Sequence, residues 1–272
     1  MTLELYANSA LGDNRVIVEG VQLGTIEMAI PSNAILGGFT DTALLFDLPY
    51  LFDSYDSAYK VLTSDYAAGI LDSLDSYGMI GVGYAVNGWR NLTANEEIRT
   101  PDELKGKKIR TMESQIHIDF FNELGASATP MSFSELYTAL QQGVVDCQEN
   151  PFITGTSGKL EEVQKYWIKT EHVLDISPIM FSKAFWDGLT EEQQGWILQF
   201  VDKFVEMNWE RVRSYEKELE DKLADNGYNV IVELTDEEKQ AFKDIVPPIY
   251  SKYQDRIGKD LIESIKKMQE EN

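Results

Sequence analysis

The sequence predicts an α/β protein built as two lobes that one long helix spans. Short strand-like and helix-like segments alternate through the first two thirds of the chain, which is the pattern of an α/β fold. A helical periodicity then runs without proline from residue 190 to residue 226, longer than one lobe of such a chain is wide. The 272 residues, 43% of them hydrophobic, suffice for one large domain or two lobes.

The first third of the chain begins with a predicted strand at residues 3–7 and an amphipathic helix at residues 13–23. A second strand is predicted at residues 26–30. A helix near residues 57–77 and a strand at residues 79–86 complete this part. The alternation indicates sheet strands covered by helices.

The middle third repeats the alternation in short, regular units. Strands are predicted at residues 107–111 and 128–131, and helices at residues 115–124 and 133–142, each helix ending at a glycine. Four helix starts carry a capping box, in which Ser or Thr precedes Glu or Gln by three residues and each side chain satisfies a free backbone N–H. These boxes begin at Thr100, Ser132, Thr190 and Thr235.

The last third opens with the long helix. Apolar residues recur at helical spacing from Ile197 to Leu223, and Asn226-Gly227 ends the pattern. At 1.5 Å per residue the helix would extend about 50 Å. Because sustained heptads are absent, we expect it to lie across both lobes rather than to form a coiled coil.

The composition is strongly acidic, with 46 Asp and Glu against 24 Lys and Arg and a formal net charge of −22. Such a surface repels phosphate backbones and anionic lipid, so we exclude a nucleic-acid partner. The longest apolar span, residues 43–52, is far shorter than the roughly 20 residues of a membrane helix. We expect no membrane span, and residues 1–4 show no signal-peptide or lipid-anchor pattern.

Arg110 is the most informative charged residue. It belongs to a basic cluster with Lys105, Lys107 and Lys108, and the lysines are expected to be solvated. Arg110 differs because it lies at the carboxyl end of a predicted strand, where open α/β sheets form their ligand crevice.

The middle third also carries one long, specific pattern. It comprises residues 107–110, 124–126, 129–146 and 148–151, with matching segments at residues 9–13, 47–52, 87–91 and 162–166. Over most of the chain these segments resemble the substrate-binding proteins of tripartite ATP-independent periplasmic (TRAP) transporters.

The resemblance implies a two-lobed, periplasmic-binding-protein-like fold, with a long helix spanning both lobes, that closes over a small organic acid. It implies delivery of that acid to a membrane permease driven by an ion gradient, without a cofactor or a metal. Arg110 matches the arginine that forms a two-pronged salt bridge with the ligand carboxylate. Asn150 matches an asparagine that contacts the same carboxylate, and Phe133 an aromatic residue that covers the ligand.

Three further site residues have two interpretations each. Arg90 matches a second arginine used by some family members, and is either a ligand contact or part of a structural salt bridge. Ser32 and Asn33 should face the cleft from the other lobe, where they either bind sugar hydroxyls or act as ordinary turn residues.

Two departures from the family are visible in the sequence. Family members usually have a strand and a helix before the segment that matches residues 3–7, so we expect the first lobe to lack a sheet neighbour. Cys147 stands where the family commonly has glycine. It cannot form a disulfide within the chain, and is either a small buried side chain or a reactive thiol.

A cysteine hydrolase is a remote alternative, because His117, His172 and Asn150 accompany Cys147 in the sequence. No nucleophile elbow, phosphate loop or paired metal-ligand motif supports an enzyme. We expect His117 on a helix surface or the cleft rim, and His172 in a strand near the hinge.

We therefore expect a periplasmic or otherwise extracytoplasmic solute receptor that is not an enzyme. One lobe should comprise residues 1–88 and 177–215, the other residues 89–176 and 216–272. The predicted ligand is a sugar acid such as a uronate or a keto-sugar acid, on the similarity of residues 110–119 to sugar-acid members. C4-dicarboxylates and 2-oxo acids stay open, as does a ligand-sensing module that serves a receptor instead of a permease.

Overall fold

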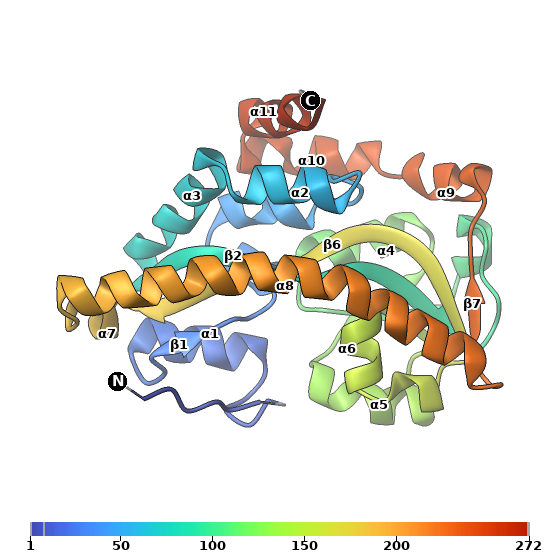
Figure 1. Cartoon of the computed structure of the whole chain (residues 1–272). Helices are drawn as coiled ribbons and strands as arrows, with labels where there is room; N and C mark the ends of the chain where they lie inside the picture. The colour runs from blue at the N-terminus through green and yellow to red at the C-terminus, as the bar shows by residue number, and fades with distance from the viewer. Residues whose placement is uncertain (1, 8, 271–272) are drawn as a thin grey trace.

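The computed structural model describes residues 2–7 and 9–270, and shows a mixed sheet with helices packed around it (Figure 1). The strand order in the described residues is β1-β6-β2-β5-β3-β4, and β7 pairs with β6. The strands are β1 (Met28–Ala29), β2 (Met79–Ala94), β3 (Lys108–Thr111), β4 (Ser127–Pro130), β5 (Cys147–Asn150), β6 (Tyr166–Ser182) and β7 (Val230–Val232).

Two long antiparallel strands connect the two halves of the molecule. β2 has 16 residues and β6 has 17, and they pair from Met79 opposite Ser182 to Ala94 opposite Tyr166. Three register shifts interrupt the pairing, between Gly81 and Gly83, Val86 and Gly88, and Arg90 and Leu92. Such bulges bend and twist a strand, so β2 can pass from one half to the other without ending.

The helices surround the sheet on both halves (Figure 1). They are α1 (Asn14–Leu23), α2 (Tyr55–Leu62), α3 (Asp65–Asp72), α4 (Gln115–Glu123), α5 (Phe133–Gln141), α6 (Phe152–Ser157), α7 (Lys183–Asp187), α8 (Glu191–Asp225), α9 (Asp236–Lys243), α10 (Pro247–Ile257) and α11 (Lys259–Glu270). Short 3-10 helices are η1 (Asn33–Gly38), η2 (Asp41–Asp47), η3 (Ser73–Tyr77), η4 (Pro101–Leu104) and η5 (Leu160–Glu162). None of the described helices is long and apolar enough to cross a membrane.

The long helix α8 confirms the prediction of a spanning helix. Its 35 residues cross both halves of the molecule along β2 (Figure 1). The Asn208 side chain donates to the carbonyl of Val86 at 3.2 Å and accepts from its N–H at 2.8 Å. The indole of Trp209 donates to the carbonyl of Tyr84 at 3.3 Å. These bonds fix the middle of α8 to the strand that joins the halves.

Several predicted elements differ in the structure. Residues 3–7 form no strand because no neighbouring strand pairs with them, and Leu5 is 86% exposed. The predicted helix at residues 57–77 is divided into α2, α3 and η3, since Ser64 starts a new helix as the N-cap of α3. The strand at residues 26–30 is reduced to β1, and the strand at residues 79–86 continues to Ala94.

The capping boxes are formed at Thr100, Thr190 and Thr235. At Ser132 the box is absent: the hydroxyl donates instead to the Glu135 carboxylate at 2.8 Å, and makes no bond to the helix backbone. The Glu135 carboxylate thus accepts from the Ser132 hydroxyl instead of from the Ser132 backbone N–H, the bond that a capping box requires.

The C-terminal helices cover the first half of the chain. α11 packs against α2 and α10 against η2 (Figure 1). Gln269 donates to the carbonyl of Leu51 at 3.0 Å, and the Tyr250 hydroxyl to that of Pro49 at 3.2 Å. The predicted lobe boundaries stay a prediction, and residues 1, 8 and 271–272 within them lie outside the described residues.

Gly88→Ala tests the bend in β2. Gly88 has φ +117°, and an added Cβ would overlap the Glu216 carboxylate, which the Tyr55 hydroxyl and the Trp89 N–H hold in place. We expect a loss of about 2–4 kcal/mol in unfolding free energy from strain and overpacking, measured by urea denaturation. Gly106→Ala is the matched control, because Gly106 has φ +76° with open space around it, and should lose only about 1–2 kcal/mol. Equal losses would contradict the steric contact with Glu216.

Candidate functional site

Arg110 is a buried cation that forms no ion pair with an acid of the described residues. It lies in β3 with 2% of its surface exposed, and its Nε and Nη2 both donate to the carbonyl of Met131, at 2.9 and 2.7 Å. Nη1 is buried and has no hydrogen-bond partner among the described residues. Burial lowers the pKa of Arg110 to about 10, so the group is still charged at neutral pH. A buried charge without a counter-ion is unfavourable, and favours the binding of an anion.

Arg90 is also a buried arginine, but unlike Arg110 it is paired with acids. It is fully buried in β2, and its Nε and Nη2 form a two-pronged pair with the Glu149 carboxylate at 2.5 and 2.8 Å. Its Nη1 lies 3.3 Å from Oδ2 of Asp175. Burial disfavours the cation, but these two carboxylates raise the pKa of Arg90 above its ordinary value. Arg90 is therefore neutralised within the protein, and its predicted contact with the ligand stays a prediction.

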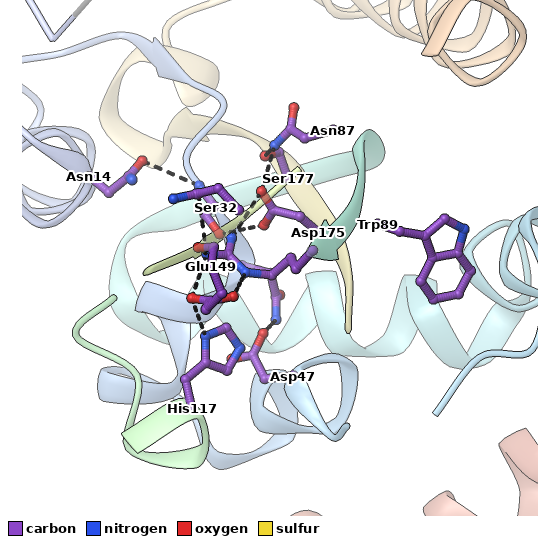
Figure 2. Close-up of polar contacts among 12 residues, drawn as sticks. Asn14, Ser32, Asp47, Asn87, Trp89, His117, Glu149, Asp175 and Ser177 are labelled. Carbon is purple, nitrogen blue, oxygen red and sulfur yellow. Dashed lines mark hydrogen bonds and ion pairs between the residues drawn. The ribbon is translucent and has the colours of Figure 1, made fainter. Parts of the chain in front are cut away.

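Glu149 is the centre of the polar cluster (Figure 2). Burial opposes its ionisation, yet the charge of Arg90 and the hydrogen bonds from His172 and Arg90 lower the pKa of Glu149 below its ordinary value. His172 donates through Nε2 to Glu149 at 3.1 Å, while its Nδ1 pairs with the Thr170 hydroxyl at 2.9 Å. Nδ1 of His117 lies 3.8 Å from Oε1 of Glu149. Side chains from β2, β6 and α4 thus converge on the Glu149 carboxylate.

Asn150 and Ser32 join this cluster from opposite sides. Oδ1 of Asn150 accepts from Arg90 at 3.2 Å, and its Nδ2 donates to Oε1 of Gln148 at 2.6 Å. The Ser32 hydroxyl donates to Oδ1 of Asp175 at 2.8 Å. Asp175 thus links Ser32, which precedes η1, to Arg90, and Arg90 is in turn paired with Glu149 of β5 (Figure 2).

Asn33 is bonded mainly to its own segment. Its Nδ2 donates to the carbonyl of Ala43 at 2.9 Å and to Oδ1 of Asp47 at 3.2 Å, while its Oδ1 has no partner in the described chain. Burial raises the pKa of Asp47 to about 7, and its Oδ2 is likewise buried without a described partner.

Phe133 makes apolar contacts on the second-half side of the chain. It is half-buried at the start of α5, where it packs on a small apolar group, and a Cβ on Gly158 would approach its ring to 2.6 Å. Its contact with a ligand stays a prediction.

A cavity of about 410 Å³ lies next to these residues. Its walls come from both halves: Arg15, Ala34, Gly37, Gly38, Leu44 and Arg256 on one side, and Glu113, Ser114, Gln115, Ile118 and Pro130 on the other. Arg15 bridges the two sides, with Nη1 3.7 Å from Oε2 of Glu113. Ala34 follows Asn33 and Pro130 precedes Met131, so the cavity adjoins residues of the predicted site.

Sequence reasoning missed part of the cluster. Glu149 belongs to the recognised 148–151 segment but was not assigned a role, and Asp175 has no local signal because its partners are distant in sequence. His117 was expected on a surface or the cleft rim, but it is 2% exposed, because α4 turns it toward Glu149. His172 lies in strand β6 as predicted.

Cys147 is fully buried, and burial raises the pKa of its thiol to about 12. Its Sγ donates to the carbonyl of Lys108 at 3.7 Å. This environment favours the inert, space-filling interpretation of Cys147. No group of three or more His, Cys, Asp and Glu in residues 2–7 and 9–270 is placed to hold a metal ion.

A two-lobed α/β frame around a buried, uncompensated arginine is the arrangement of a receptor for acidic solutes. The chain belongs to the family described as bacterial extracellular solute-binding protein, family 7, whose profile matches residues 1–256. Members of this family are solute-binding receptors, and its relatives confirm the resemblance to TRAP substrate-binding proteins.

Three similar proteins illustrate the family. The C4-dicarboxylate-binding periplasmic protein DctP of Rhodobacter capsulatus is 33% identical over 270 residues, which are 97% of this chain and 80% of the relative. A TRAP periplasmic solute-binding protein from Shewanella oneidensis with bound succinate has a TM-score of 0.95 and 28% identity, covering 98% of this chain and 88% of that one. The sugar acid binding protein DctPAm from Advenella mimigardefordensis with galactonate has a TM-score of 0.93 and 31% identity, covering 97% and 85%.

Glu149→Gln tests the centre of the cluster. Removing this charge leaves Arg90 buried with one acid fewer, so we expect the free energy of unfolding to fall by about 3–5 kcal/mol at neutral pH. Because the pKa of Glu149 is lowered in the folded state, its stabilisation is present above the ordinary value of 4.5 and is lost as the pH falls below it. The difference in unfolding free energy between variant and wild type, measured by urea denaturation, should therefore become smaller at acid pH.

The matched control is Glu218→Gln, which breaks an exposed pair with Arg211 and should change the free energy of unfolding little, because solvent screens both charges. If Glu149→Gln lowered the free energy of unfolding no more than this control does, Glu149 would not hold the cluster together.

Proposed function

We propose that this protein is an extracytoplasmic receptor that binds a monocarboxylated sugar acid between its lobes and delivers it to the membrane permease of a TRAP transporter. One observation carries the proposal: Arg110 is a buried cation whose Nη1 has no partner among the described residues. The galactonate bound to the Advenella protein supports the choice of a sugar acid.

The geometry of Arg110 indicates how a carboxylate would bind. The carbonyl of Met131 occupies the Nε side of the guanidinium and takes one Nη2 hydrogen. The N–H groups left over are the two on Nη1 and the second on Nη2; of these, one on Nη1 and the one on Nη2 point side by side from the end of the guanidinium. A carboxylate can accept both in parallel, and gains a charge-assisted pair that lysine could not reproduce.

The charges of the site favour a single carboxylate. Arg90 is neutralised by Glu149 and Asp175, and burial lowers the pKa of both His117 and His172. Besides the two arginines and the two imidazoles, the polar groups described around the cluster are hydroxyls, amides and acids. The hydroxyls and amides suit ligand hydroxyls, and the acids repel a second carboxylate. The neutral candidates are Ser32, Asn33, Asn87, Ser114 and Asn150.

C4-dicarboxylates are the second candidate class, because Arg15 at the cavity wall offers another cation. Arg15 is more than half exposed and already pairs with Glu19 at 3.2 Å and with Glu113 at 3.7 Å. A second carboxylate there would compete with these acids. The succinate-bound Shewanella protein is the relative that supports this alternative.

Function then consists of binding and closure, with no covalent step. A ligand that touches both lobes binds the closed conformation better than the open one, and so shifts the population toward closure. The closed form would be the one that the permease recognises. Membership of the family supports a periplasmic location and a permease partner.

Arg110→Lys tests the carboxylate contact. Lysine keeps the charge but loses the fork, so we expect galactonate affinity to fall by at least about tenfold in calorimetric titration. The apo melting temperature should change by no more than about 2–4 °C, because the guanidinium forms no ion pair among the described residues. Arg99→Lys, an exposed pair with Glu238, is the control and should leave binding unchanged. Unchanged affinity, or an unfolded apo protein, would show that Arg110 serves the fold instead.

A ligand panel tests the substrate class. Because the cluster holds one uncompensated cation, galactonate and glucuronate should each bind at least about tenfold more tightly than succinate or 2-oxoglutarate. Calorimetric titration at constant salt gives the comparison. Tight binding of succinate with no binding of either sugar acid would overturn the sugar-acid proposal and leave the dicarboxylate alternative.

A further inference from the structure

The first turn of α4 carries buried polar atoms that make no bond in the described chain. They are Oγ of Ser114 and both ring nitrogens of His117, on side chains that are each 2% exposed. A buried donor or acceptor left unsatisfied is unfavourable by about 1–3 kcal/mol, so native proteins supply a partner from the chain, from water or from a ligand.

One of these two residues, Ser114, lines the cavity, and the other is a near neighbour on the same helix. Ser114 is the N-cap of α4 and lines the cavity of about 410 Å³ together with Gln115 and Ile118. His117 is three residues on, which places it beside Ser114 on one helix face. α4 begins shortly after Arg110, and the positive charge of Arg110 helps to disfavour protonation of His117. Ser114 thus lines the cavity, and His117 lies within electrostatic range of Arg110.

The charge state and tautomer of His117 can be derived from its surroundings. Burial lowers the pKa of His117 to about 3, so the ring is neutral and has one N–H donor and one acceptor nitrogen. Its Nδ1 lies 3.8 Å from the ionised Glu149, on the side drawn in Figure 2. A lone pair facing a carboxylate would be repelled, so the proton belongs on Nδ1. Nε2 is then an acceptor that needs a donor.

We propose that Nε2 of His117 accepts a hydrogen bond from the hydroxyl on the carbon next to the ligand carboxylate, and that Ser114 contacts the same hydroxyl. The site would then select open-chain 2-hydroxy acids, the aldonates, among sugar acids. This inference rests on the proposed function, because it requires the carboxylate to lie on Arg110.

The chemistry separates the candidate ligands. A 2-hydroxyl group donates to Nε2 and can accept from Ser114. In a pyranose uronate the corresponding atom is the ring oxygen, and in a 2-oxo acid it is a carbonyl oxygen. Both only accept, so each would leave Nε2 unsatisfied and bind more weakly. Succinate has no polar group at this carbon.

The test is calorimetric titration with galactonate, 2-deoxygalactonate and galacturonate. Wild-type protein should bind galactonate at least about tenfold more tightly than either other acid. In His117→Leu the ratio of galactonate to 2-deoxygalactonate affinity should fall below about threefold, while the affinity for 2-deoxygalactonate changes little. Glu123→Gln, at the exposed end of α4, is the control and should keep the wild-type ratio.

Ser114→Ala provides a second variant if His117→Leu does not fold, and should lower the same ratio by at least about threefold. If both variants kept the wild-type ratio of galactonate to 2-deoxygalactonate affinity, His117 and Ser114 would not contact the 2-hydroxyl. Equal binding of all three acids by wild-type protein would also overturn that contact. In both cases the proposed receptor function would stand. If wild-type protein bound none of the three, the sugar-acid function itself would fail and this inference with it.

Discussion

An uncompensated guanidinium inside the protein is the constraint on which the account depends. Arg110 is held by one backbone carbonyl and lacks an acidic neighbour in ion-pair contact among the described residues, so its charge is only partly stabilised by the protein itself. The cost of such a site is recovered when an anion enters. An affinity for carboxylates and a partly destabilised empty state are therefore two consequences of one arrangement.

The two buried arginines differ in their partners: Arg90 is paired with acids, whereas Arg110 is bonded to a backbone carbonyl. Arg90 forms a two-pronged pair with Glu149 and also approaches Asp175, which itself holds Ser32. This network joins β2, β5 and β6 near the register shifts of the long strands. Glu149 and Asp175 are paired with Arg90, and no carboxylate of the described residues is in ion-pair contact with Arg110.

Local sequence predicted the parts of the fold that depend on local interactions. The helical periodicity and the Thr190 box were enough to locate α8, and the placement of Arg110 at a strand end was enough to select it. Residues 3–7 were predicted wrongly because a strand needs a partner that propensity cannot supply. The Ser132 box was predicted wrongly because the Glu135 carboxylate accepts from the hydroxyl rather than from the backbone. The acids that neutralise Arg90, and the burial of His117, depend on contacts between distant segments. No local pattern contains that information.

The most direct measurement of the central claim is a crystal structure of the protein with galactonate bound. The account predicts a ligand carboxylate oxygen within about 3 Å of Nη1 of Arg110, with the Arg90–Glu149 pair intact. It would be contradicted by a carboxylate bound at Arg15 or Arg90 while Nη1 of Arg110 still faced no ligand atom.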